Sequence, residues 1–316
     1  MKILRVFLFL ILPAFNGCSY AQEPPKQSAA FVSGTRIRLI PPADFAPATQ
    51  FPGYQLESHG SSIMITEIPG PFAETTAGFS KPSELMKRNM TILDKQEVKL
   101  DGQNGLLFKV AQKAYETDFL KWLLVLGDEK ETAMITATFP KQYEGELSEK
   151  MKASVLTATW DRKKDVSQTE GLNFTIQEKG ELKQAKRVSN LLMFTKNGIF
   201  PSKDINDPLF IIGQSISKTA IPDNEKYAKT RILQISEITD IEIEQSNKIA
   251  IDNLNGYEIL AKGKDAKSGQ PMVVYQVMLF EEQNYFLMQG LVGSKNQQSN
   301  LEIFKEMART FKRKKL

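Results

Sequence analysis

The stretch Val98-Lys-Leu-Asp-Gly-Gln-Asn-Gly105 decides the fold, because a related stretch, Ile249-Ala-Ile-Asp-Asn-Leu-Asn-Gly256, follows it at an offset of 151 residues, from 98 to 249. In both stretches apolar and polar residues alternate, and Asp, Asn and Gly then supply what a tight turn requires. Alternation resumes after the turn, which predicts a β-hairpin. Two copies of one hairpin so far apart predict two copies of a whole domain.

The length of 316 residues accommodates two cores of ordinary size. We expect a first module at residues 31–161 and a second module at 170–316. Residues 22–30 and 162–169 are polar and aperiodic, so both are predicted to be linkers.

The first module is expected to combine six strands with two helices. The predicted strands cover residues 35–39, 62–68, 96–100, 106–112, 122–126 and 132–139. A short helix is expected from Ser80, its cap, to Met90. A closing helix is predicted because Leu147, Met151, Val155 and Leu156 fall on one side of a helical period.

The second module repeats this order. Residues 171–176 align with 34–39 at an offset of 137, so the later offset of 151 requires 14 additional residues, which we expect near 191–207. Asp223 is predicted to cap the middle helix. A closing helix with Leu301, Phe304, Ala308 and Phe311 on one side follows strands at 272–280 and 285–292, and the offset of 151 aligns Trp160 with Phe311.

Hairpin-linked strands with helices in the middle and at the end of each module predict one fold class. It is an α+β fold with two tandem copies of a twisted antiparallel sheet flanked by helices.

Two pairs of phrases carry a family resemblance. They are Phe51-Pro-Gly-Tyr54 with residues 62–68, and Gly256-Tyr-Glu-Ile-Leu-Ala261 with residues 274–280. With the order of elements, they resemble the PsbP-like (Mog/PsbP-type) domains of uncharacterised exported bacterial proteins. The resemblance implies an accessory, docking or assembly role without catalysis. It assigns a role to no residue of this sequence.

The first 21 residues are typical of a signal peptide. Lys2 and Arg5 precede the apolar run Val6–Leu12, which is too short to span a bilayer. Ser19-Tyr-Ala21 then predicts cleavage after Ala21. The protein is therefore expected to be exported, to the periplasm or out of the cell.

Cys18 supports a second interpretation of the same segment. Phe15-Asn-Gly-Cys18 loosely resembles a lipobox, which would make Cys18 the lipidated first residue and the only membrane contact. Cys18 is also the single cysteine, so no intramolecular disulfide is expected.

The charge balance argues against a nucleic-acid partner. Of 41 basic residues, 39 remain without Lys2 and Arg5, against 37 acidic residues, so the surplus is two. So small a surplus leaves no electrostatic footprint for nucleic acid. The basic run Lys312-Arg-Lys-Lys315 is expected to be a solvated tail, with a membrane-surface or acidic-partner contact as the alternative.

Conventional catalytic and metal sites are not predicted. His59 is the only histidine, and Ser61 and Ser62 lie too near to it on a polar turn to be oriented as a nucleophile. Period-two spacing places the carboxylates of Asp240-Ile-Glu-Ile-Glu244 along the solvated face of a strand. Asp101 with Asn104, and Asp252 with Asn255, are interpreted as turn residues rather than cation ligands. No cofactor motif is present.

Two functions remain open. The first is a non-catalytic binding or assembly factor of the bacterial cell envelope, whose partner is another envelope protein. The second is a hydrolase with an unconventional carboxylate or Ser/His site. A cleft with two converging acidic side chains of raised pKa would favour the hydrolase.

Overall fold

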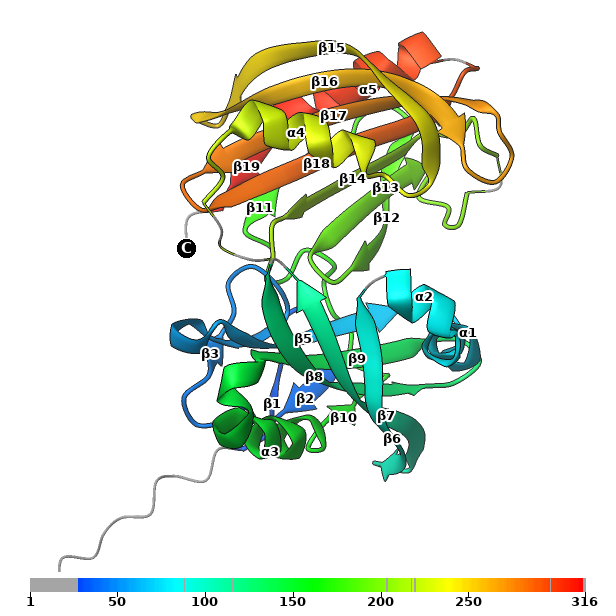
Figure 1. Cartoon of the computed structure of the whole chain (residues 1–316). Coiled ribbons are helices and arrows are strands. Elements are labelled where there is room, and N and C mark those ends of the chain that lie inside the picture. The colour runs from blue at the N-terminus through cyan, green and yellow to red at the C-terminus, as the bar shows by residue number, and fades with distance from the viewer. Residues whose placement is uncertain are drawn as a thin grey trace, which may run out of the picture.

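The computed structural model describes residues 28–314 except 88, 115, 203, 217, 219 and 296. Both processing residues of the sequence analysis, Cys18 and Ala21, lie outside the described residues. The described chain folds into two modules, each built on a seven-stranded antiparallel sheet (Figure 1). The predicted α+β class, with two antiparallel sheets and flanking helices, is therefore what the chain adopts. None of the described helices is long and apolar enough to span a bilayer.

The strands of the two large sheets follow the same order. From one edge to the other, the first sheet consists of β3 (Ala46–Pro47), β4 (Gly53–Leu56), β5 (Ser61–Ile68), β9 (Thr132–Pro140), β8 (Thr117–Gly127), β7 (Gln103–Ala114) and β6 (Met90–Leu100). The second consists of β12 (Leu182–Val188), β13 (Leu191–Lys196), β14 (Leu209–Gln214), β18 (Asn284–Gly293), β17 (Pro271–Glu281), β16 (Leu254–Asp265) and β15 (Ile238–Ile251). Each strand of one sheet thus has a counterpart at the same position in the other.

Two small sheets and five helices complete the modules. The small sheets are β1 (Ala30–Phe31), β2 (Ile37–Leu39) and β10 (Thr159–Trp160) in the first module, and β11 (Phe174–Thr175) and β19 (Lys312–Arg313) in the second. The helices are α1 (Phe72–Ala77), α2 (Pro82–Lys87), α3 (Glu144–Val155), α4 (Asn224–Leu233) and α5 (Gln297–Arg309). Helices α3 and α5 each pack on one face of their own sheet and bury the largest apolar clusters there.

The repeated hairpin is present in both modules. Val98 lies opposite Gly105 in the first, and Ile249 opposite Gly256 in the second. The turn residues Asp101 and Asp252 have φ angles of 49° and 51°, the left-handed conformation that Asp and Asn tolerate better than most residues. The turn interpretation of these two aspartates is confirmed.

The helix expected from Ser80 to Met90 is shorter than predicted. Ser80 ends a 3-10 turn, Gly78–Ser80, and α2 spans only Pro82 to Lys87. Met90 already belongs to β6, because Met90 and Ile92 bury their side chains against Phe108 and its neighbours. The cap predicted at Asp223 is confirmed, since its Oδ1 accepts the backbone N–H of Lys226 at 2.9 Å.

The alignment of Trp160 with Phe311 is wrong by two residues. Trp160 lies opposite Ile37, whereas Arg313 lies opposite Phe174, the counterpart of Ile37. The shift arises at one turn, because the turn from β16 to β17 is two residues longer than the turn from β7 to β8. Arg313 therefore occupies the place of Trp160.

The additional residues of the second module are not one insertion at 191–207. Strand β13 begins at Leu191 and is the counterpart of β4, so it belongs to the shared sheet. The pairing of β5 with β9 and of β14 with β18 places Ile65 opposite Ile135 and Ile212 opposite Met288. Counterparts therefore differ by 147 residues at this strand, and by 140 at Gly53 and Met193. The extra residues are thus divided among the β12–β13 hairpin, the loop after β13 and the region around α4.

Candidate functional site

A groove of about 350 Å³ lies between the two modules, and we call it groove 1. Residues of both modules and of the linker line it, including Arg36 before β2, Glu67 on β5, Glu131 before β9, Lys164 in the linker and Lys186 on β12. The strand register explains the convergence of the carboxylates. Glu67 lies opposite Ala133, so the side chains of Glu67 and Glu131 meet at the same end of the sheet.

Arg36 binds both carboxylates. Its Nε donates to Glu67 Oε1 at 2.8 Å, and its Nη2 donates to Glu131 Oε2 at 2.7 Å. The three side chains are 24%, 21% and 26% exposed, so the ion pairs are largely shielded from water. Burial alone would lower the pKa of Arg36, but the hydrogen bonds and charges of Glu131 and Glu67 outweigh it and hold that pKa above its ordinary value.

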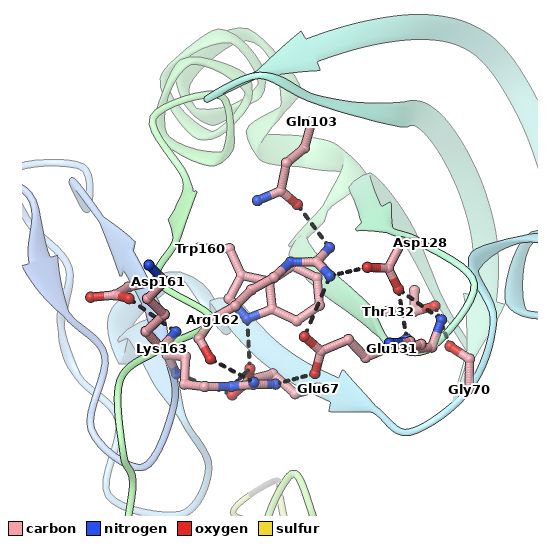
Figure 2. A network of polar contacts seen from close by, with 12 residues as sticks. Glu67, Gly70, Gln103, Asp128, Glu131, Thr132, Trp160, Asp161, Arg162 and Lys163 are labelled. Atoms are coloured by element: carbon pink, nitrogen blue, oxygen red, sulfur yellow. Dashed lines mark hydrogen bonds and ion pairs between the residues drawn. The ribbon is translucent and has the colours of Figure 1, made fainter.

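Trp160 and Arg162 extend this network, as Figure 2 shows. The Trp160 Nε1 donates to Glu67 Oε1 at 2.9 Å. The Arg162 guanidinium lies over the indole ring at 4.1 Å from its centroid, within cation–π range. The same guanidinium forms ion pairs with Asp128 and, at 3.4 Å, with Glu131.

Asp128 is held in its ionised form by the turn before β9. The backbone N–H groups of Lys130 and Glu131 donate to its Oδ1, at 2.7 and 3.1 Å. These backbone hydrogen bonds, with the ion pair to Arg162, hold the pKa of Asp128 below its ordinary value.

The second module contributes two cations to groove 1, and they differ in how they are held. Arg187 is committed to backbone carbonyls, because its Nε donates to Ser189 O at 2.6 Å and its Nη1 donates to Glu170 O. Lys186 is half-buried, and no hydrogen bond or ion pair to its ammonium is found among the described residues. Burial lowers the pKa of Lys186, the charge of Glu131 opposes that shift, and the charge of Arg36 adds to it.

The arrangement in groove 1 suits polar recognition better than proton transfer. Glu67 and Glu131 do converge in a cleft, and convergence was the first of the two features that would favour a hydrolase. Both carboxylates accept hydrogen bonds from Arg36, so their oxygens already have partners within the chain. The carboxylates of groove 1 thus hold the guanidinium groups of Arg36 and Arg162 in place.

The second module has a corresponding groove of about 580 Å³, which we call groove 2. The strand pairings match Glu67 with Gln214 and Glu131 with Asn284, and the offset of 137 matches Arg36 with Asn173. Asn173 Nδ2 donates to Gln214 Oε1 at 3.1 Å, so a neutral amide pair replaces the ion pair of Arg36 with Glu67.

Arg313 forms the ion pairs of groove 2 with two carboxylates. Its Nε donates to Asp252 Oδ2 at 3.0 Å, and its Nη1 forms an ion pair with Glu281 at 2.5 Å. The hydrogen bonds from the backbone N–H and side chain of Arg313 hold the pKa of Asp252 below its ordinary value. The basic run at 312–315 is therefore not simply a solvated tail, because Arg313 is one-third exposed and fixed by two carboxylates.

His59 lies in a 3-10 turn, Glu57–His59, as the sequence analysis expected of a surface turn. The His59 side chain contacts residues other than Ser61 and Ser62, the two serines weighed as its partners above. Its Nδ1 is 2.8 Å from Ser58 Oγ, its Nε2 is 3.6 Å from Glu146 Oε2, and its ring contacts that of Tyr143. Ser61 Oγ instead donates to the backbone carbonyl of His59. None of these side chains lines groove 1 or groove 2.

The remaining candidates behave as turn or surface residues. Asp240 and Glu244 lie on the edge strand β15 and form ion pairs with Lys264 and Lys262 of β16, at 2.9 and 2.5 Å. In the described part of the chain, no group of three or more His, Cys, Asp or Glu side chains is arranged to hold a metal ion.

No family model matches this sequence, and no curated protein is similar to it. Among solved structures, the chain is similar to the immunity protein TplEi of T6SS from Pseudomonas aeruginosa, at 14% identity over 90% of this chain and 97% of that chain, with a TM-score of 0.33. It is also similar to a chain of the Tle4-Tli4 complex, at 12% identity, over 90% of this chain and 97% of that chain, with a TM-score of 0.33. A protein of unknown function and putative regulator from Pseudomonas aeruginosa matches at 12% identity over 44% of this chain and 95% of that chain, with a TM-score of 0.31. Likenesses of this strength carry no conclusion about function.

Proposed function

We propose that this chain is an exported, non-catalytic protein-binding factor and that groove 1 receives an acidic group of the partner. The observation that carries the proposal is Lys186. It faces a groove formed by both modules, and its ammonium has no described hydrogen-bond or ion-pair partner. Membership of the PsbP-like family and a place in the cell envelope are part of the same proposal.

The other cations of groove 1 are already engaged. Arg36 binds Glu67 and Glu131, and Lys164 Nζ donates to Thr35 O at 3.0 Å. A half-buried ammonium without such a partner is costly, and a carboxylate placed beside it would recover that cost. A carboxylate of a protein partner would supply the charge that the ammonium of Lys186 lacks.

The test is site-specific photo-crosslinking in cells of the native host. A photoreactive residue replaces Ile68, which lines groove 1, or Glu149, an exposed residue of α3 that serves as the control position. We expect a cross-linked partner from position 68 only, and loss of that product in Lys186→Gln.

The matched control is Lys183→Gln. Lys183 lies on the same strand, is half exposed, and forms an ion pair with Glu178 at 3.2 Å outside groove 1. This variant removes the same charge and should retain the cross-link. A product that survives Lys186→Gln, or that is lost equally in Lys183→Gln, would contradict the proposal.

A further inference from the structure

We infer that the two modules are joined as the halves of an isologous dimer, so that the same segment of each contacts the other about an approximate two-fold axis. The surface of one module that faces the other module is thus complementary to a second copy of the same module. This inference stands independently of what groove 1 binds.

Ser33 and Glu170 mark the axis. They are counterparts at the offset of 137, and Ser33 Oγ lies 3.4 Å from Glu170 Oε1, so two equivalent positions touch each other. An isologous interface requires such a self-contact wherever the axis passes, whereas a head-to-tail interface joins different surfaces.

The neighbouring glycines repeat the contact in both directions. Gly34 N donates to Glu170 Oε1 at 3.1 Å, and a Cβ on Gly34 would lie 2.7 Å from Glu170 O. A Cβ on Gly171, the counterpart of Gly34, would lie 2.9 Å from Ser33 Oγ. Both glycines have positive φ angles, of 73° and 70°. Each module thus brings the same glycine turn against the other.

Farther from the axis, each module extends an edge segment into the groove of the other. Thr49 and Gln50, which follow β3, line groove 2. Gln50 Nε2 donates to Asn284 Oδ1, and the carbonyl of Thr49 accepts a hydrogen bond from Asn173 Nδ2. At and just after the end of the corresponding strand β12, Lys186, Arg187 and Ser189 line groove 1, as does Glu131, the counterpart of Asn284. The exchange is reciprocal, as two-fold symmetry demands.

The test uses the full chain with a specific protease site inserted after Asp165, an exposed linker residue. The folded protein is cleaved and then analysed by size-exclusion chromatography at micromolar concentration. We expect the two halves to elute together, because the interface needs no covalent connection. Elution of two separate folded halves would overturn the inference.

Symmetry is tested by equivalent substitutions in the same cleaved protein. Gly34→Ala and Gly171→Ala should each raise the dissociation constant of the halves by roughly ten-fold, the effect of one lost good contact. Gly102→Ala is the control, because Gly102 has a φ of 76° and no atom within 4 Å of its added Cβ. It should change the constant less than about two-fold. An effect of only one of the two interface substitutions would show that the interface is not isologous.

Discussion

Groove 1 and groove 2 occupy the same place in two copies of one fold, yet their side chains differ in charge. In groove 1 Arg36 lies between two carboxylates, whereas three amides occupy the corresponding positions of groove 2, where Arg313 is held by Asp252 and Glu281 instead. The pairs of counterparts are Arg36 and Asn173, Glu67 and Gln214, and Glu131 and Asn284.

The second module shows that the fold does not require the charges of the first. Asn173, just before β11, donates to Gln214 on β14 at 3.1 Å, and Arg36, just before β2, donates to Glu67 on β5 at 2.8 Å. A neutral pair therefore makes the same connection in the second module as the ion pair makes in the first. Partly buried ion pairs are a weak source of stability because desolvation offsets their attraction. The charges of groove 1 are therefore better explained by what the groove contacts than by folding.

The largest effects are expected from counterpart core residues of the closing helices. Met151 and Phe304 are both fully buried, so Met151→Ala should cost about 2–5 kcal/mol and Phe304→Ala about 3–5 kcal/mol of stability. Both tryptophans, Trp122 and Trp160, belong to the first module. Unfolding followed by tryptophan fluorescence should therefore shift strongly for Met151→Ala and little for Phe304→Ala, while circular dichroism reports both. Equal fluorescence shifts would show that the modules do not have separate cores.

A smaller difference should separate Glu67→Ala from Gln214→Ala. Removing Glu67 takes an acceptor from both Arg36 and Trp160, which should cost about 2 kcal/mol, since hydrogen bonds to charged groups are worth about 1.5–3 kcal/mol. Removing Gln214 takes the side-chain acceptor from Asn173 and should cost about 1 kcal/mol. Urea unfolding measures both values. A larger loss for Gln214→Ala would show that the hydrogen bonds of Glu67 stabilise the fold less than the amide pair of Gln214 does.

Acid should affect the two modules through their aspartates. The pKa values of Asp128 and Asp252 are lowered in the folded chain, by backbone hydrogen bonds first and by Arg162 and Arg313. Such carboxyls stabilise the folded state above their unfolded pKa, near 4, and that contribution is lost as pH falls through the folded pKa. The melting temperature should therefore fall below about pH 4, less steeply in Asp128→Asn and in Asp252→Asn. A steeper fall in either variant would contradict the sign of these shifts.

The smallest effect is expected at His59. It is a half-buried turn residue whose contacts to Ser58 and Glu146 lie outside both grooves, so His59→Ala should change stability by less than about 0.5 kcal/mol. It should also leave the cross-link from position 68 unchanged. Loss of the biological activity of the chain in this variant, at normal abundance and melting temperature, would favour a hydrolase built on Ser58, His59 and Glu146.

The alternation of apolar and polar residues is enough to predict the two sheets. The hairpins at 98–105 and 249–256 and the cap at Asp223 depend on local patterns, and local patterns are readable in one sequence. The helix to Met90 was predicted too long, because the strand that begins there is fixed by packing against Phe108.

Groove 1 was not predictable in the same way. Arg36, Glu67 and Glu131 come from segments that meet only through the register of β5 with β9, which no short-range pattern encodes. Arg313 was concealed within a basic run, and its role depends on carboxylates at two distant turns. The one available signal was Glu67, the only charged residue of its strand and next to its end.

The most direct measurement transfers the composition of groove 2 into groove 1. The variant carries Arg36→Asn, Glu67→Gln and Glu131→Asn together with Lys186→Gln, which removes the cation proposed to bind the partner. It is examined with the photoreactive residue at position 68 in the native host. Because the second module folds with these amides, we predict that the variant stays folded by circular dichroism but loses the partner cross-link. A folded variant that cross-links the partner at full yield would contradict the claim that the charges of groove 1 serve binding.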